Sequence, residues 1–133
     1  MTKSIVPQMI EMKSVVLLSD TPEVTAAFYR EVMRLPLETE RHRGTERHWA
    51  CQLGSIHFAI HERKTFWLPS ALAGEPPATV VSFTVENLEE MVAHLATHNV
   101  QIVARTKIGP MSFVAVRDPD GRHVCCGTRY PGA

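Results

Sequence analysis

The sequence predicts an α+β domain built from two copies of a βαβββ module. Three observations predict this fold: an internal repeat at a spacing of about 67 residues, a capping residue before an amphipathic helix in each half, and a tight-turn sequence before the last strand. A chain of 133 residues is long enough to bury the core of one such domain. We expect one domain over residues 1–133, with module one at about 11–62, a linker or flap at 63–78 and module two at about 79–127.

The first strand of each module is predicted by a short apolar run. Residues 14–20 (SVVLLSD) align with residues 81–87 (VSFTVEN), and each run ends in a residue that favours the start of a helix. Asp20 and Asn87 are the expected caps. Glu23 and Glu90 follow three residues later, where a carboxylate suits the positive end of the helix dipole.

Each cap is followed by a helix with one apolar stripe and then by three further strands. The expected stripes are Val24, Ala27, Phe28 and Val32 in the first half and Leu88, Met91, Val92 and Leu95 in the second. The expected strands are 35–37, 48–53 and 56–61, then 100–103, 111–116 and 123–126.

Charge and cysteine content limit the classes of partner. Fourteen basic side chains balance fourteen acidic ones without a long run of either sign, so we expect no nucleic-acid or membrane partner. Three cysteines, Cys51, Cys125 and Cys126, are too few for a disulfide scaffold and favour a reducing compartment. Residues 1–18 lack the pattern of a secretory leader, so a cytoplasmic protein is expected.

Two phrases carry a family resemblance. Residues 27–33 (AFYREVM) close the first strand-cap-helix segment, and residues 117–121 (RDPDG) form a turn before the last strand. On these residues, the chain from Met12 to Gly127 resembles the glyoxalase/bleomycin-resistance/extradiol-dioxygenase (vicinal oxygen chelate) superfamily. The resemblance implies an eight-stranded mixed sheet curled around a cleft, and a homodimer. Arg34 departs from the family, which usually has glycine just past the first helix.

The alternation of side chains along strands predicts which residues face that cleft. Ser14, Val16 and Leu18 are expected toward the helix and Lys13, Val15 and Leu17 toward the cleft, whereas Val81, Phe83 and Val85 are expected in the core. Phe58, Ile60, Val124 and Cys126 are expected to be buried, with Ala59 and Val80 on the cleft side. The predicted ligand-binding residues are Lys13, Trp49, His57, His61, Ser82, Thr84, His123 and Cys125.

The resemblance also implies where a metal would bind. In metal-dependent members four ligands lie on the first and last strands of each module, and the matching positions here hold Lys13, Ala59, Val80 and Cys125. Because these are not the usual ligands of nickel, zinc, iron or manganese, no metal cofactor is expected. The alternative is a nonstandard zinc or nickel site among His57, His61, His123 and Cys125. His42, His48, His94 and His98 are expected at the surface or at helix ends.

Three functions fit these expectations. The first is a small-molecule-binding protein of the metal-free, bleomycin-resistance-like branch, with Trp49, Phe66 and Trp67 as candidates for stacking on a flat ligand. The alternative is a lyase or isomerase similar to lactoylglutathione lyase, with a nonstandard metal or metal-free proton transfer. Its candidate catalytic residues are His57, His123 and Cys125. The third is an interaction domain whose cleft has no ligand. The sequence does not predict which ligand is bound.

Overall fold

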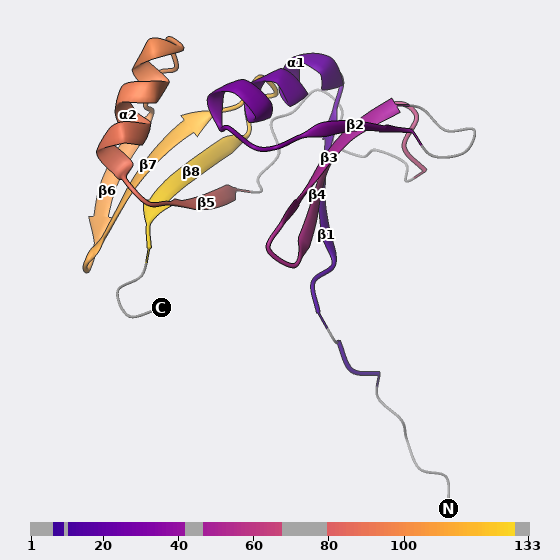
Figure 1. Ribbon diagram of the computed structural model, residues 1–133, viewed down its shortest axis with the longest axis horizontal. Coiled ribbons are helices and arrows are strands. Elements are labelled where there is room, and N and C mark those ends of the chain that lie inside the picture. Colours follow the sequence, from indigo (N-terminus) through magenta and orange to yellow (C-terminus); the bar gives the residue numbers. More distant parts are fainter. Residues whose placement is uncertain (1–6, 10, 42–46, 68–79, 130–133) are drawn as a thin grey trace, which may run out of the picture.

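The two predicted modules are present. The computed structural model describes residues 7–9, 11–41, 47–67 and 80–129, and Figure 1 shows both modules along the chain. Module one consists of β1 (Ser14–Ser19), α1 (Pro22–Ala27) continued by a π-helical turn η1 (Phe28–Val32), β2 (Glu38–Arg41), β3 (Arg47–Leu53) and β4 (Ile56–Glu62). Module two consists of β5 (Val81–Val85), α2 (Leu88–Thr97), β6 (Ala104–Ile108), β7 (Met111–Arg117) and β8 (His123–Thr128).

The eight strands form two mixed sheets of four strands each. Their orders are β1-β4-β3-β2 and β5-β8-β7-β6, so the two modules have the same topology. In each sheet the first and last strands of the module pair in parallel and the remaining pairs are antiparallel. The α+β class is confirmed, but the expected eight-stranded sheet is two separate sheets that do not close into a barrel within the described chain.

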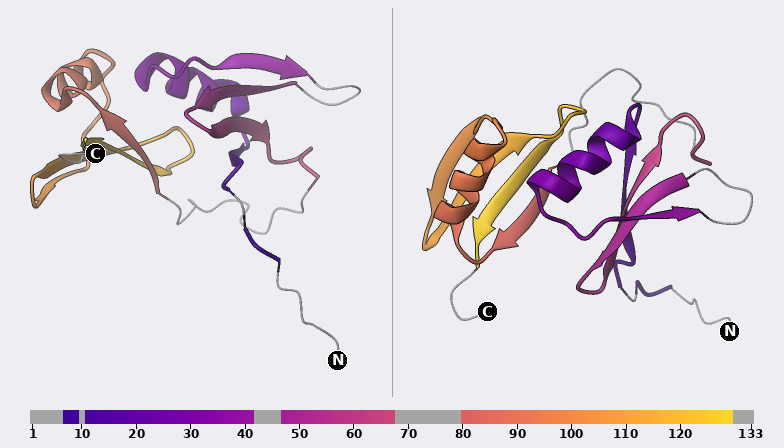
Figure 2. Two further views of the ribbon diagram at one scale, coloured as in Figure 1. Left: turned by 60° about the horizontal axis from the view of Figure 1, so that its bottom comes forward. Right: turned by 45° about the horizontal axis from the view of Figure 1, so that its top comes forward.

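One hydrophobic core joins the modules. Each sheet has one face covered by helix, and side chains from both covered faces belong to a single cluster that includes Phe58, Leu95 and Val124. The ring of Tyr29, at the end of the first helix, lies 5.4 Å from Phe58 and 6.5 Å from Phe83 between ring centroids. The first helix therefore packs on its own sheet and also against the second module, and Figure 2 shows it between the two sheets.

The repeat has an offset of 66 residues, one fewer than expected. Val15 pairs with Phe58 in module one, and Val81 pairs with Val124 at the equivalent place in module two. A slip of one residue moves every side chain of a strand to the other face. The prediction for β1 was therefore wrong: Leu17 is 5% exposed and lies in the core, whereas Val16 is 37% exposed on the opposite face. The predicted faces of β4, β5 and β8 are confirmed, with Phe58, Ile60, Val124 and Cys126 all buried.

The error arose at the first helix cap. Asn87 caps α2 as predicted, because its side chain accepts a hydrogen bond of 3.0 Å from the Glu90 backbone N–H. The first helix instead begins after Thr21, and Asp20 forms an ion pair with Arg63. The predicted stripe of this helix shifts accordingly, since Val24 is exposed and Thr25 is buried. The stripe of α2 is confirmed by Leu88 and Leu95, with Met91 and Val92 packed beside them.

The second strand of each module lies further along the chain than expected. Leu35 and Leu37 are buried in the connection that precedes β2, and Ile102 packs against the core before β6. The edge strands themselves carry polar residues, and all five residues of β6 are exposed. In the described part of the chain no helix is long and apolar enough to cross a membrane. Most of the predicted linker at residues 63–78 lies outside the described residues, as does His42.

Candidate functional site

Each sheet has one face that no helix of its module covers, and these faces hold most of the predicted site residues. The first uncovered face is defined by the strand register and comprises Ser14, Val16, Leu18, Glu38, Glu40, His48, Ala50, Gln52, His57, Ala59 and His61. The second comprises Ser82, Thr84, Ala104, Thr106, Ile108, Met111, Phe113, Ala115, Arg117, His123, Cys125 and Gly127. Because the covered faces meet in one core, the uncovered faces point away from it and do not form one wall.

The centre of the first uncovered face is apolar. Ala59 on β4 pairs with Ala50 on β3 and with Val16 on β1, so these three side chains lie in one row across the sheet. The alanines are 1% and 2% exposed although no helix covers this face. Longer side chains of the neighbouring rows, on either side, surround them. Ala59, Ala50 and Val16 therefore form a small apolar floor, and Glu38 continues the row beyond Ala50.

Glu40 and three histidines lie beside this apolar floor. One carboxylate oxygen of Glu40 lies 3.0 Å from Nε2 of His48 and 3.9 Å from Nε2 of His57. The ring of His48 is buried and stacks on His61 at a centroid distance of 4.1 Å. His57 is accessible, whereas His48 is not. This arrangement places a histidine that solvent can reach beside a carboxylate that accepts or stabilises a proton.

The second uncovered face combines an aromatic ring with small side chains. Phe113 on β7 is half-buried and pairs with Gly127 on β8, and a Cβ atom built on Gly127 would lie 2.5 Å from the Phe113 ring. Ser82 pairs with Cys125 in the adjoining row. Arg117 and His123 pair with each other and are exposed. In the described strands of this sheet, no Asp or Glu lies on this face.

The three cysteines have different environments. Burial raises the pKa of the Cys51 thiol and raises the pKa of the Cys126 thiol to about 11, and the neighbouring Cys125 contributes to the second shift. Both thiols face the core and are held protonated at neutral pH. Cys125 is half-buried on the uncovered face beside Ser82, so it is the most accessible thiol of the chain.

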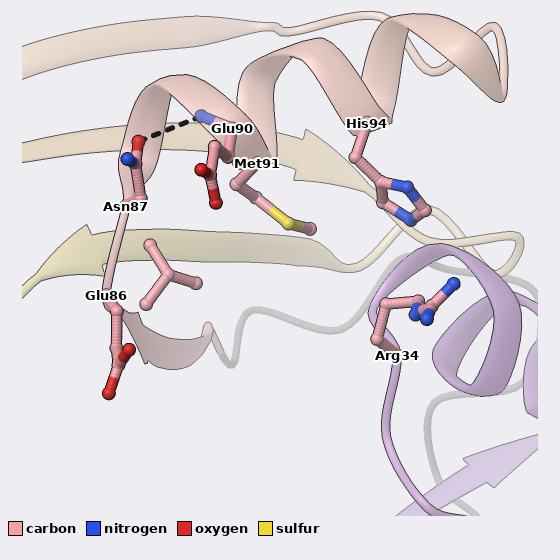
Figure 3. Close-up of a pocket in the computed structure, with 7 residues that line it drawn as sticks. Arg34, Glu86, Asn87, Glu90, Met91 and His94 are labelled. Atoms are coloured by element: carbon pink, nitrogen blue, oxygen red, sulfur yellow. Dashed lines mark hydrogen bonds between the residues drawn. The ribbon is translucent and has the colours of Figure 1, made fainter.

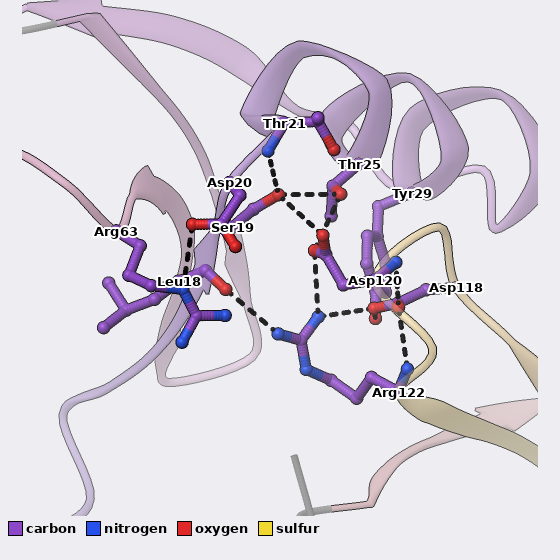
Figure 4. Close-up of polar contacts among 10 residues, drawn as sticks. All are labelled: Leu18, Ser19, Asp20, Thr21, Thr25, Tyr29, Arg63, Asp118, Asp120 and Arg122. Atoms are coloured by element: carbon purple, nitrogen blue, oxygen red, sulfur yellow. Dashed lines mark hydrogen bonds and ion pairs between the residues drawn. The ribbon is translucent and has the colours of Figure 1, made fainter. Parts of the chain in front are cut away.

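A buried polar network connects the modules at the turn before β8 (Figure 4). Asp120 accepts hydrogen bonds from Ser19 at 3.0 Å and from Thr25 at 2.8 Å, both in module one. Tyr29 donates to Asp118 at 2.7 Å. Arg122 pairs with Asp118 and donates to the Leu18 carbonyl. The RDPDG segment is therefore more than a tight turn, because Asp118 and Asp120 bind side chains of the first module.

A separate pocket of about 300 Å³ lies where the end of the first helix meets α2 (Figure 3). It is lined by Arg34, Val85, Glu86, Asn87, Glu90, Met91 and His94. Nε2 of His94 lies 2.9 Å from the Val32 carbonyl, which identifies this nitrogen as the protonated donor. Arg34 has a left-handed backbone with φ of 63°, the conformation for which the family's usual glycine is suited.

The predicted ligand-binding residues fall into three groups. His57 and His61 lie on the first uncovered face, and Ser82, Thr84, His123 and Cys125 lie on the second. Trp49 is 5% exposed in the core, beneath the Arg47 guanidinium, and so does not line either face. Lys13 is exposed before β1, on the strand side shared with Val15 and Leu17 rather than with His57. The binding roles remain predictions.

The donor atoms at the expected metal positions do not fit a metal. Ala59 has no donor atom, and Cys125 alone is insufficient for a site of the usual kind. Among the described residues, no group of three or more His, Cys, Asp or Glu side chains is arranged to hold a metal ion. The histidines of the suggested nonstandard site are also divided between the two uncovered faces, so we derive no chemistry that passes through a metal.

Glu40, His48 and Phe113 lie on the uncovered faces but were not among the predicted site residues. His48 was expected at the surface but is buried, because its ring stacks on His61 and contacts Glu40. Glu40 lies on the same face as His48 because the two residues pair across β2 and β3. Alternation along β7 places Phe113 on the second uncovered face. Side-chain alternation along the middle strands of each module is the sequence signal that points to these residues.

Comparison with known proteins supports this architecture. The model of the Glyoxalase/Bleomycin resistance protein/Dioxygenase superfamily matches residues 11–125. The uncharacterized protein YaeR of Escherichia coli (strain K12) is 28% identical over 104 residues, which cover 74% of this chain and 80% of YaeR.

Two solved structures illustrate the range of proteins with this fold. TnmS3, an antibiotic binding protein from Streptomyces sp. CB03234, is 12% identical with a TM-score of 0.72, and the match covers 94% of this chain and 100% of TnmS3. Lactoylglutathione lyase from Agrobacterium tumefaciens is 18% identical with a TM-score of 0.68, over 92% of this chain and 95% of the lyase. At these identities the likeness concerns the fold alone. Because the family model spans most of the sequence, the chain belongs to the Glyoxalase/Bleomycin resistance protein/Dioxygenase superfamily.

Proposed function

We propose that this protein binds a small organic molecule without a metal, in the manner of the bleomycin-resistance-like branch of its superfamily. The observation that carries the proposal is Ala59. By the family resemblance, its position corresponds to a metal-ligand position of metal-dependent relatives, and its side chain lies on the uncovered face. A methyl group there contributes apolar contact and no donor atom.

The fold by itself does not choose between binding and catalysis, since both an antibiotic binding protein and a lyase share it. The chemistry of the side chains favours binding. The second uncovered face combines apolar or small residues with a few polar groups, which is the usual composition of small-molecule sites, and the first has apolar residues at its centre. His57 and His61 on one face, and Ser82, Thr84, His123 and Cys125 on the other, are the groups that we expect to orient a ligand.

We further propose a homodimer in which a second copy helps to enclose the ligand. Within one chain each sheet has a face outside the core, and no described helix or strand covers either face. Val16 and Val80 are 37% and 54% exposed on or beside these faces, which is apolar surface that a second copy would bury. A cytoplasmic location, suggested by the free thiols, remains part of the same proposal.

A second candidate function is metal-free proton transfer by a lyase or isomerase. The contact of 3.9 Å between His57 and Glu40 favours it, because a base in an active site is commonly oriented by a neighbouring carboxylate. His57 would then accept a proton from the substrate and Glu40 would position its ring. This candidate requires turnover, whereas the binding proposal requires only affinity.

A ligand screen with one blocking variant and one matched control variant tests the proposal. Thermal shifts of the wild-type protein are measured against aromatic antibiotics and glutathione adducts, with metal content determined by elemental analysis. A ligand at a hundred times its Kd stabilises the protein by roughly 2.7 kcal/mol. We expect Thr84→Trp to abolish the shift and Val24→Trp, on the exposed side of α1, to retain it. Stoichiometric metal that is lost on mutating His57, or conversion of a glutathione adduct, would favour the enzyme instead.

A further inference from the structure

Phe113 is an aromatic side chain on an uncovered face that the core does not require. Its strand neighbours Val114 and Val116 fill the core, while Phe113 points to the opposite side and remains half-buried. We propose that the Phe113 ring is the stacking platform of the ligand site and that the ligand is a flat aromatic acid. This inference rests on the proposed binding function and identifies its ligand class.

Gly127 allows the ring to lie close to the sheet. The two residues pair across β7 and β8, and a Cβ atom on residue 127 would come within 2.5 Å of two atoms of the Phe113 ring. Such a contact is too close for any residue other than glycine unless the ring moves. The glycine therefore lets the aromatic side chain lie over the backbone and leaves its other side available for a ligand.

The side chains around Phe113 suit the edges of a planar ligand. Thr84 and Thr106 flank the ring in the same row, one through the pairing with Gly127 and the other through the pairing with Phe113. The adjoining row toward Arg117 contains only small residues, namely Ser82, Cys125, Ala115 and Ala104, whereas the row on the other side contains Ile108 and Met111. Small side chains beside a ring provide space for a second flat group, and the hydroxyls provide hydrogen bonds at its edge.

The charge on this face favours an anionic group at one end of the ligand. Arg117 and His123 pair at the far end of β7 and β8 and are exposed, and the described residues of this face include no carboxylate. Arg117 lies four residues from Phe113, about 13 Å along the strand at roughly 3.3 Å per residue. Two fused rings with a carboxylate span much of this distance, and the guanidinium side chain reaches toward the remainder.

The other candidate stacking residues are less suitable. Trp49 is in the core, and Phe66 packs edge-on against His61 with centroids 5.1 Å apart. Trp67 follows β4, is 79% exposed and packs against Phe66 with centroids 5.8 Å apart. The first uncovered face also carries Glu38 and Glu40, which would repel an anion. Of these four aromatic residues, only Phe113 lies on a face that carries Arg117 and His123.

Two acids of similar size and charge but different shape test the platform. Naphthalene-2-carboxylate is flat and decahydronaphthalene-2-carboxylate is not, and binding of each is measured by isothermal titration calorimetry. We expect the wild-type protein to prefer the flat acid by about tenfold, consistent with the usual contribution of aromatic stacking. Phe113→Leu should reduce the preference to less than about threefold, and Phe113→Trp should retain it.

Further variants separate this inference from the proposed function. Gly127→Ala should weaken binding of the flat acid, because the added methyl group displaces the Phe113 ring. Circular dichroism checks that each variant folds. Equal affinity of the wild-type protein for both acids, or an unchanged preference in Phe113→Leu, would overturn the platform. If neither acid binds while other compounds do and Thr84→Trp blocks them, the platform is wrong and the binding function stands. If no compound binds, both fail.

Discussion

The hydroxyl of Tyr29 donates a hydrogen bond of 2.7 Å to Oδ2 of Asp118, and both side chains are buried. Tyr29 belongs to module one and Asp118 to module two. The same Asp118 carboxylate also pairs with Arg122, which donates to the Leu18 carbonyl in module one. The orientation of the two uncovered faces therefore depends on a polar contact as well as on the shared apolar core.

Tyr29→Phe tests the contribution of this hydrogen bond. The variant keeps the ring contacts with Phe58 and Phe83 but leaves a buried carboxylate oxygen with one donor fewer. We expect the free energy of unfolding to fall by about 1 to 3 kcal/mol, as measured by urea denaturation. Thr97→Val removes an exposed hydroxyl and is the matched control, for which we expect less than about 0.5 kcal/mol. Similar losses in the two variants would contradict the proposed contribution.

A double-mutant cycle tests whether Asp120 couples the modules. Ser19→Ala and Asp120→Ala each remove one end of the 3.0 Å contact, and the double variant removes both. Because the contact is largely buried, we expect a coupling energy of about 1 kcal/mol or more. The exposed pair of Glu89 and Arg105 provides the control cycle, with an expected coupling below about 0.5 kcal/mol. Equal coupling in both cycles would show that Asp120 acts like a surface charge.

Features that depend on neighbouring residues were predicted from the sequence, whereas contacts between distant residues were not. Residues 117–121 are a turn in the structure, as their own proline and glycine predict. The partners of Asp120 lie about a hundred positions away, in a module whose placement depends on core packing. No local pattern encodes that contact, and for this reason the role of Asp120 was not predicted.

The faces of the strands show the same limit. β8 has a mixture of polar and apolar residues, so its buried face was predicted from alternation. Residues 15–18 of β1 are all apolar and gave no such signal, and their assignment depended on which residue caps the first helix. The edge strands β2 and β6 are largely polar and lack an apolar pattern that would mark them as strands. For this reason both strands were predicted too early in the chain, and Glu40 was not recognised as a residue of the uncovered face.

The buried thiol of Cys126 predicts that stability declines in alkaline solution. Burial raises the pKa of this thiol from 9.0 to about 11, so the folded chain holds the proton more tightly than the unfolded chain. The stabilisation is complete below pH 9 and is lost as the pH rises toward 11. The free energy of unfolding is expected to fall by about 2 to 3 kcal/mol over this range. Burial and the adjacent Asp118 also raise the pKa of Tyr29, which continues the decline above pH 10.

Urea denaturation between pH 8 and pH 11 measures this decline. Cys126→Val keeps an apolar side chain of similar size and cannot ionise, so we expect a smaller decrease between pH 9 and pH 11 than in the wild-type protein. Cys125→Val, on the uncovered face, is the matched control and should retain most of the wild-type slope, because burial is the larger cause of the raised pKa of Cys126 and Cys125 the smaller. The same slope in all three proteins would contradict the assignment to Cys126.

Arg34→Gly is expected to stabilise the protein. Arg34 has φ of 63°, and a non-glycine residue in this left-handed region is disfavoured by about 1 to 2 kcal/mol. Glycine removes that cost but increases the entropy of the unfolded chain by about 0.4 to 1 kcal/mol, so we expect a net gain of about 0.5 to 1 kcal/mol. Arg34→Ala keeps the Cβ atom and should give no gain, which separates the backbone effect from loss of the charge beside Glu86 and Glu90. Equal stability changes in the two variants, measured by thermal denaturation, would show that the side chain rather than the backbone conformation determines stability at this position.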